Sequence, residues 1–272
     1  MFETKMDVLE WYEKQPRTLT SEFVNTINWR EARAYPLDKR FIPVLLYMRD
    51  VEVLTEMYYQ EMMQTPTGKD PVVKRFMQRW REEEITHGEL IDRFLNEIGF
   101  QTPKDWKIKT RNSVPKSYTT TTRILTALTN IFGKNFVATH MTFGAINEMS
   151  TAQGYRKLME TAKHPVLTQI IKGIIREESI HTKFYFSVAR LELQRSKFSR
   201  QLARFVVENF WQPVGQGAKP ARETHYVIKT LFNDKQAMNW IDRNISSKIR
   251  LLPGFENSNK INLTIEKILL EG

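Results

Sequence analysis

Apolar residues recur every three or four positions through long stretches of the chain, which is the spacing of amphipathic α-helices. Residues 41–64 show the pattern at Ile42, Leu45, Leu46, Val53 and Met57. No stretch alternates apolar and polar residues in the way that a half-buried strand would. The pattern and its helix-breaking residues predict long helices over 41–64, 71–97, 120–163 with an interruption near 133, 165–194 and 199–210. Shorter helices are predicted over 222–232 and 234–248, with a last helical turn after a loop near 253–260.

These elements predict an all-α fold with an antiparallel four-helix bundle as its core. The core spans residues 40–195, and accessory helices follow over 198–272. Neither a low-complexity stretch nor a domain linker interrupts the helical pattern. We therefore expect residues 1–272 to form a single domain.

Composition narrows the chemistry that such a bundle could carry. The chain has no cysteine, which excludes disulfides, thiolate nucleophiles and iron–sulfur clusters, so any metal must be bound by Glu, Asp and His. The formal net charge of +10 favours an acidic partner, but the Lys and Arg residues are scattered and match no nucleic-acid motif. With no secretory signal and no apolar run of membrane-spanning length, we expect a cytoplasmic protein.

Two of the five histidines follow a glutamate by three positions, each within a long predicted helix. The pairs are Glu84/His87 and Glu178/His181. Residues i and i+3 project from the same helix face, so a carboxylate and an imidazole can bind one metal. The flanking residues on that face are apolar, and a buried ionised carboxylate without a partner would cost several kcal/mol. Metal coordination is the natural compensation.

A carboxylate-bridged bundle needs one further Glu from each of the other two helices. Glu148 precedes Glu178 by 30 residues, the separation expected for two long antiparallel helices joined by a short turn. On the first helix Glu52, 32 residues before Glu84, fits best, although Asp50 and Glu56 are alternatives that helical phase does not separate. Oxygen and nitrogen ligands without sulfur suit two iron ions, or manganese.

The segment WREEEITHGELIDRFL at 80–95 resembles the acyl-acyl-carrier-protein desaturase family, which has a ferritin-like diiron fold. The stretch from Glu148 to His181, ending IIREESIHTKFY, is similar to the second half of that family's site. The similarity extends more weakly into the 230s and 240s. It departs from the family on the first helix, where RDVEVLTE replaces the usual paired acidic residues before Ala-Leu-Pro.

The resemblance implies residue roles that spacing alone does not. Metal ligands are expected at Glu52, Glu84, His87, Glu148, Glu178 and His181, with Thr151 as the threonine at the dioxygen face. Glu177 would bond the imidazole of His87, and Trp29 would extend that chain towards an electron donor. The implied reaction is an O₂-dependent desaturation of an acyl chain on an acidic acyl carrier protein, with electrons from a ferredoxin-type donor. The enzyme is expected to be a homodimer.

Two other classes of protein remain open at this point. The first is a different diiron oxidase, such as an N-oxygenase or a ribonucleotide reductase small subunit. The latter would need a tyrosine beside the metal, for which Tyr47, Tyr58 and Tyr59 are candidates. The second is a non-enzymatic iron-binding bundle, although the helices after residue 194 favour an enzyme with a substrate site.

Overall fold

The computed structural model describes residues 2–271, with the side chains of 121–125 and 128 excepted, and its fold is all-α. Helices account for 75% of the chain. Within the described residues, the β pairing is limited to an isolated bridge between Gln216 and Lys219. The predicted fold class is confirmed.

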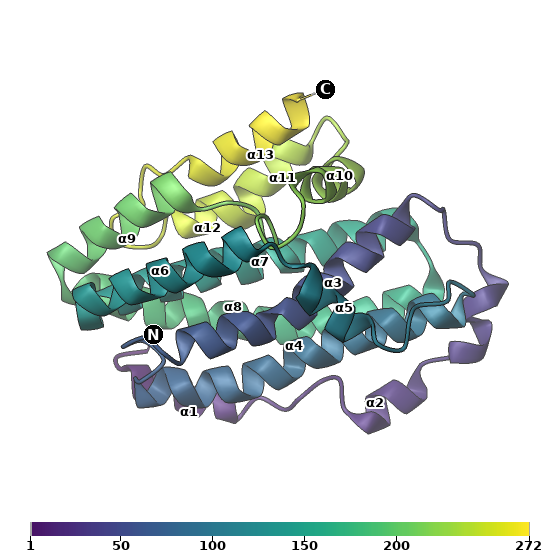
Figure 1. Ribbon diagram of the computed structural model, residues 1–272, viewed down its shortest axis with the longest axis horizontal. Helices are drawn as coiled ribbons and strands as arrows, with labels where there is room; N and C mark the ends of the chain where they lie inside the picture. The colour runs from purple at the N-terminus through teal and green to yellow at the C-terminus, as the bar shows by residue number, and fades with distance from the viewer. Residues whose placement is uncertain (1, 272) are drawn as a thin grey trace.

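Four long helices lie side by side and form the bundle: α3 (Phe41–Met62), α4 (Pro71–Glu97), α7 (Val137–Ala162) and α8 (Pro165–Arg195) (Figure 1). Short turns make α3 and α4, and likewise α7 and α8, antiparallel neighbours, and α4 also packs against α8. The bundle core is a continuous set of buried apolar side chains. Four helices with inward-facing residues thus surround one central axis.

Local capping fixes where the paired helices begin. The Asp70 carboxylate accepts the backbone N–H groups of Val72 and Val73 at the start of α4, with Pro71 in the first turn. At the other turn, His164 Nδ1 accepts the N–H of Leu167 and Pro165 opens α8. Lys163, between α7 and α8, has a left-handed φ of 49°.

The predicted third helix is two helices. α6 (Lys116–Phe132) ends at Gly133, whose φ of 56° a side chain would resist, and a short 3₁₀ turn, η2 (Gly133–Phe136), leads into α7. Only α7 belongs to the bundle. A short helix, α5 (Trp106–Ser113), lies where the sequence predicted a loop.

Further elements cover the bundle on two sides. Before α3 lie α1 (Lys5–Glu13), α2 (Ser21–Thr26) and η1 (Trp29–Ala34), for which the sequence made no prediction. After α8 come the accessory helices: α9 (Lys197–Phe210), α10 (Ala221–Leu231), α11 (Ala237–Ile241), the π-helical turn η3 (Asp242–Ser246), α12 (Ser247–Ile249) and α13 (Lys260–Leu270). They form a separate layer above the bundle in Figure 1. The predicted last turn is therefore a complete helix.

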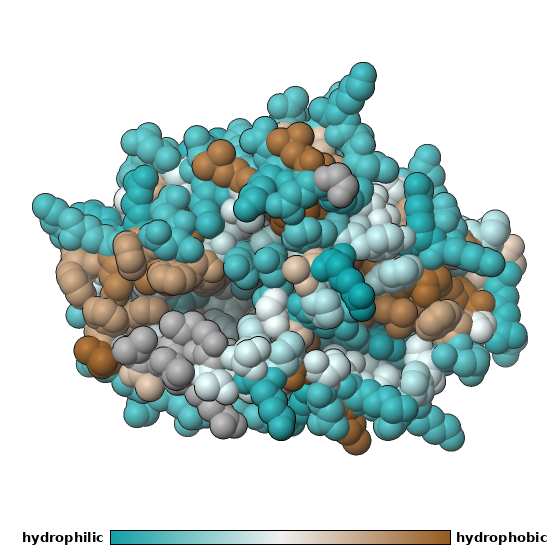
Figure 2. Space-filling view, turned by 45° about the horizontal axis from the view of Figure 1, so that its top comes forward, coloured by the Kyte–Doolittle hydropathy of each residue, from teal (hydrophilic) through white to brown (hydrophobic). Residues whose placement is uncertain are grey.

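Large apolar side chains are exposed near the ends of α6 and α9. Figure 2 shows brown and tan side chains gathered at that end of the molecule, and a second brown area at the opposite end. Large exposed hydrophobic residues there include Ile131, Phe132, Phe198 and Phe205, and the rings of Phe132 and Phe198 lie 6.4 Å apart. Among the described residues, no helix combines the length and hydrophobicity needed to cross a bilayer.

Candidate metal centre

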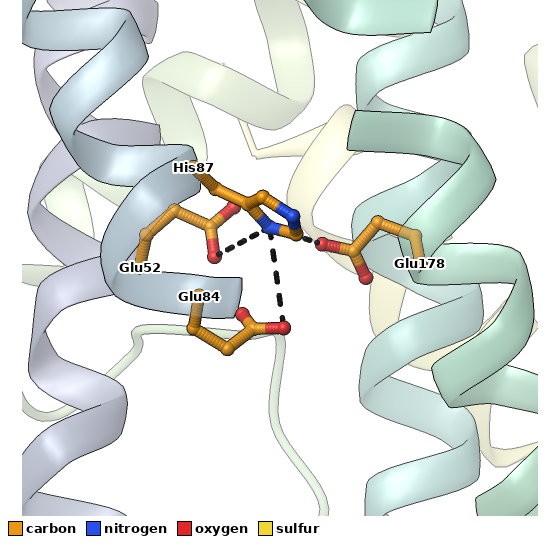
Figure 3. Close-up of side chains that lie close together, drawn as sticks. All are labelled: Glu52, Glu84, His87 and Glu178. Atoms are coloured by element: carbon orange, nitrogen blue, oxygen red, sulfur yellow. Dashed lines mark ion pairs between the residues drawn. The ribbon is translucent and has the colours of Figure 1, made fainter. Parts of the chain in front are cut away.

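The six predicted ligand residues converge at the centre of the bundle. Their ligand atoms form two groups, and within each group all atoms lie within 4.8 Å of one another. The first group is Glu52, Glu84, His87 and Glu178 (Figure 3), and the second is Glu84, Glu148, Glu178 and His181. Because Glu84 and Glu178 belong to both groups, these two residues would be available to an ion in either one. Each group could hold a metal ion.

Each bundle helix contributes to the cluster. Glu52 lies on α3 and Glu148 on α7, while α4 and α8 each supply one Glu-x-x-His pair. A close approach of α3 to α4 brings Glu52 near His87: a Cβ on Gly88 would lie 2.9 Å from Val53 Cγ2 and 3.1 Å from the Arg49 carbonyl oxygen. The glycine after His87 is therefore required by this packing.

The inner atoms of the cluster lack hydrogen-bond partners. Glu84 Oε1, both carboxylate oxygens of Glu178, and the Nδ1 atoms of His87 and His181 are buried and make no hydrogen bond. They face one another: His181 Nδ1 lies 3.0 Å from Glu84 Oε1, and His87 Nδ1 lies 3.3 Å from Glu178 Oε1. Burial, followed by the charges of neighbouring carboxylates, raises the pKa of Glu84 and that of Glu178 well above the usual range. Buried polar atoms are normally satisfied, so these orphaned atoms in an all-O/N donor set fit a bound metal.

Outer carboxylates fix both imidazoles. His87 Nε2 donates to Glu177 Oε2 at 2.9 Å, and His181 Nε2 donates to Glu83 Oε2 at 2.7 Å. Each imidazole thereby turns its Nδ1 towards the cluster, as metal-binding histidines do. Burial alone would lower the pKa of His87. The hydrogen bond to Glu177 and the nearby charge of Glu84 outweigh burial and raise this pKa to about 9.

The two outer carboxylates have different partners of their own. Glu177 Oε1 accepts the backbone N–H groups of Thr18 and Leu19 at 2.7 and 2.9 Å. Glu83 Oε1 accepts a hydrogen bond from Arg79 Nε at 2.7 Å. Sequence reasoning named Glu177 but missed Glu83. The signal was available, since each Glu-x-x-His pair is preceded directly by a second glutamate.

Aromatic side chains hold the two outermost ligand carboxylates. The Tyr155 hydroxyl donates to Glu52 Oε1, and Trp80 Nε1 donates to Glu148 Oε1 at 3.0 Å. Both aromatic residues are buried. Sequence reasoning did not assign either residue to the site, because nothing in helical spacing distinguishes a ring that donates to a ligand from one that only packs.

The alternatives to Glu52 on the first helix have other partners. Asp50 is bound by Arg49 and Lys219, at 2.7 and 2.8 Å. Glu56 pairs with Arg81 Nε at 2.6 Å. Only Glu52 among the three lies in a candidate metal group.

The two remaining predicted residues lie outside the ligand groups. Trp29 uses its single N–H on the Val24 carbonyl at 3.0 Å and packs beneath Arg93. It therefore does not donate to Glu177, and the backbone of Thr18 and Leu19 takes the place expected for it. Thr151 lies one turn after Glu148 and lines a cavity beside the centre.

This cavity of about 100 Å³ lies between the bundle and the accessory helices. Glu52, Thr151 and Gly154 form its wall towards the candidate metal centre. Apolar side chains from α3, α10, η3 and α13 make up most of the rest, including Val51, Ile228, Ile245 and Ile261. The candidate metal centre thus borders an apolar space that could receive a hydrocarbon group.

Comparison with family models, with curated proteins and with solved structures finds no match for this chain, so its function is inferred from the site itself.

Proposed function

We propose that this protein is an O₂-dependent diiron desaturase that introduces a double bond into an acyl chain carried on acyl carrier protein. The observation that supports this most is the position of the apolar cavity. It meets a buried cluster of four carboxylates and two imidazoles at Glu52, beside Thr151. A hydrocarbon in that cavity would contact the candidate ligand Glu52.

Iron bound by the six ligands would supply the activation of dioxygen for attack on an unactivated C–H bond. In the overall reaction, two hydrogens leave adjacent methylenes and dioxygen is reduced to two waters. That balance requires two more electrons and two more protons, so an external one-electron donor must act twice. The predicted ferredoxin-type donor would meet this need.

The protein's own residues orient the candidate ligands, exclude water from the site and supply protons. Glu83 and Glu177 hold the imidazoles through Nε2, so that their Nδ1 atoms remain available to metal. Tyr155 and Trp80 restrain one oxygen each of Glu52 and Glu148. The apolar cavity excludes water. Thr151 is one of several hydroxyl residues on its wall, with Ser150 and Thr224, and its position one turn after Glu148 suits it to relay a proton at Oγ1.

The acyl substrate fits the charge of the protein. A carrier protein of acidic surface would be steered towards a chain of net charge +10. The homodimer stays a prediction.

A second function is favoured by Tyr155. Its hydroxyl donates a hydrogen bond to Glu52, so a phenol group lies directly beside the candidate metal centre. That arrangement also suits a subunit of the ribonucleotide reductase type, which stores an oxidising equivalent on a tyrosine. Of the candidates named from the sequence, Tyr47 bonds to Val214 and Thr224 instead. The ring of Tyr58 lies 6.0 Å from that of Trp80, which donates to the ligand Glu148.

Fatty-acid profiling of a bacterium that expresses the chain with added iron tests the proposal. New double bonds should appear with the wild type and disappear with Glu178→Ala. Glu82→Ala, an exposed carboxylate on α4, is the matched control and should retain them. No new unsaturation despite about two bound irons would refute the desaturase. A phenoxyl EPR signal lost in Tyr155→Phe would establish the second function.

A further inference from the structure

A surface groove separate from the apolar cavity lies between the N-terminal segment, α7 and α8. Its volume is about 660 Å³, and Thr18 forms part of its wall. Three cationic side chains line it: Arg156, Lys172 and Arg176. We call it the basic groove. No Asp or Glu is among its lining residues.

The three cations have no acidic partners among the described residues. Many other Lys and Arg side chains form ion pairs, such as Arg81 with Glu56, whereas Arg156, Lys172 and Arg176 form none. Their charge is therefore not neutralised within the protein. The groove also contains partly apolar surface at Met159 and Ile180. A basic, partly apolar concavity of this kind suits an acidic protein surface.

The groove is joined to the candidate metal centre by a short series of hydrogen bonds. The backbone N–H of Thr18, at the groove wall, donates to Glu177 Oε1 at 2.7 Å. The other oxygen of Glu177 accepts from His87 Nε2 at 2.9 Å. Two hydrogen bonds thus separate the wall of the groove from a ligand imidazole.

We propose that the basic groove is the docking site for the electron donor, a small acidic redox protein of the ferredoxin type. This inference rests on the proposed function, which needs two one-electron deliveries per double bond. Each delivery oxidises one donor and reduces the centre by one electron. An acyl carrier protein fits the groove less well, because the apolar cavity proposed for the acyl chain lies against α3, α7 and the accessory helices and shares no lining residue with the groove.

Charge reversal tests the docking site directly. One variant, Lys172→Glu/Arg176→Glu, reverses the charge of the groove on α8. A second variant, Arg156→Glu, reverses it on α7. Lys74→Glu/Arg222→Glu is the matched control, since both residues are exposed, neither lines the groove, and the double change lowers the net charge equally. Circular dichroism and thermal melts confirm that each variant folds. The probe is an acidic [2Fe–2S] ferredoxin, titrated calorimetrically against each protein at low and at high salt.

We expect the groove variants to bind ferredoxin at least tenfold more weakly at low salt, and the control less than threefold more weakly. The rate at which ferredoxin reduces the iron-loaded protein should fall in parallel, while reduction by dithionite should be unchanged. Equal losses in groove and control variants would overturn the proposal, as would the absence of wild-type binding. So would a loss confined to acyl carrier protein titrated in the same way.

The calorimetric readout also separates this inference from the proposed function. Ferredoxin that binds at the groove while the wild type makes no double bonds would refute the desaturase alone. Double bonds formed with dithionite, together with ferredoxin binding that charge reversal does not alter, would refute the docking site alone.

Discussion

Replacing Glu178 with glutamine should separate metal binding from folding. The side chain is fully buried, and both of its oxygens lack hydrogen-bond partners. Glutamine keeps the shape and removes the charge. A metal ligand and a member of an ordinary buried ion-pair network respond to this change in opposite ways.

The charges in the cluster decide the expected size of the effect. Four carboxylates carry −4 when ionised, and two protonated imidazoles offset at most +2, whereas two divalent cations would balance all four. The pKa of Glu178 is raised well above its usual range by burial and then by Glu148 and Glu52. Keeping such a carboxyl group ionised destabilises the folded state by about 1.4 kcal/mol for each unit by which the pH exceeds its pKa. Glutamine cannot ionise and therefore avoids this destabilisation. We therefore expect Glu178→Gln to change the metal-free free energy of unfolding by between zero and about 1 kcal/mol, in the stabilising direction.

Urea unfolding with chelator, and with anaerobic Fe²⁺ or Mn²⁺, measures both effects. Wild type should gain about 2.7 kcal/mol when free metal is a hundredfold above its dissociation constant, and the variant should gain little. If the cluster were only an ion-pair network, the metal-free variant would lose roughly 3–5 kcal/mol. That loss, with metal stabilisation retained, would refute the metal centre.

Three further predictions concern the surroundings of the cluster. Glu177→Gln should weaken metal binding about 10–100-fold, measured by competition with a chelating dye, while Glu82→Gln should not. Asp50→Asn breaks its buried pairs with Arg49 and Lys219 and should cost roughly 3–5 kcal/mol in urea unfolding, yet leave the metal stoichiometry unchanged. The pKa of His87 is about 9 in the folded protein, whereas the ordinary value is 6.5. Protonated His87 therefore contributes about 3 kcal/mol to the free energy of unfolding below pH 6.5, and this contribution is lost as the pH rises through 9. Thermal melts of the metal-free protein should show this decline, and the metal-loaded protein should not.

The fold was largely predictable because the bundle helices are long and carry apolar residues at helical spacing. The bounds of α4 match the prediction at both ends, since Asp70-Pro71 and Gly99 are strong local signals. The interruption predicted near residue 133 is present, and it divides the predicted third helix into α6 and α7. Nothing local to Gly133 indicated that only the second of these two helices would belong to the bundle.

Helical spacing predicts some residues of the candidate site but not others. The two Glu-x-x-His pairs and Glu148 follow from helical periodicity. The choice among Asp50, Glu52 and Glu56 depends on counter-ions that are distant in sequence, such as Lys219, 169 residues from Asp50. Tyr155, which holds Glu52 from another helix, was missed for the same reason.

The bonds from Thr18 and Leu19 to Glu177 have a consequence for biosynthesis. Leu19 and its acceptor are 158 residues apart, which at about 5–20 residues per second means roughly 8–30 s between their syntheses. During that interval the early segment has no carboxylate to receive its amides, and the imidazole of His87 has no outer partner. Maturation of the centre therefore has to wait until α8 has left the ribosome, and metal delivered earlier would find at most four of the six ligand residues, because Glu178 and His181 lie on α8.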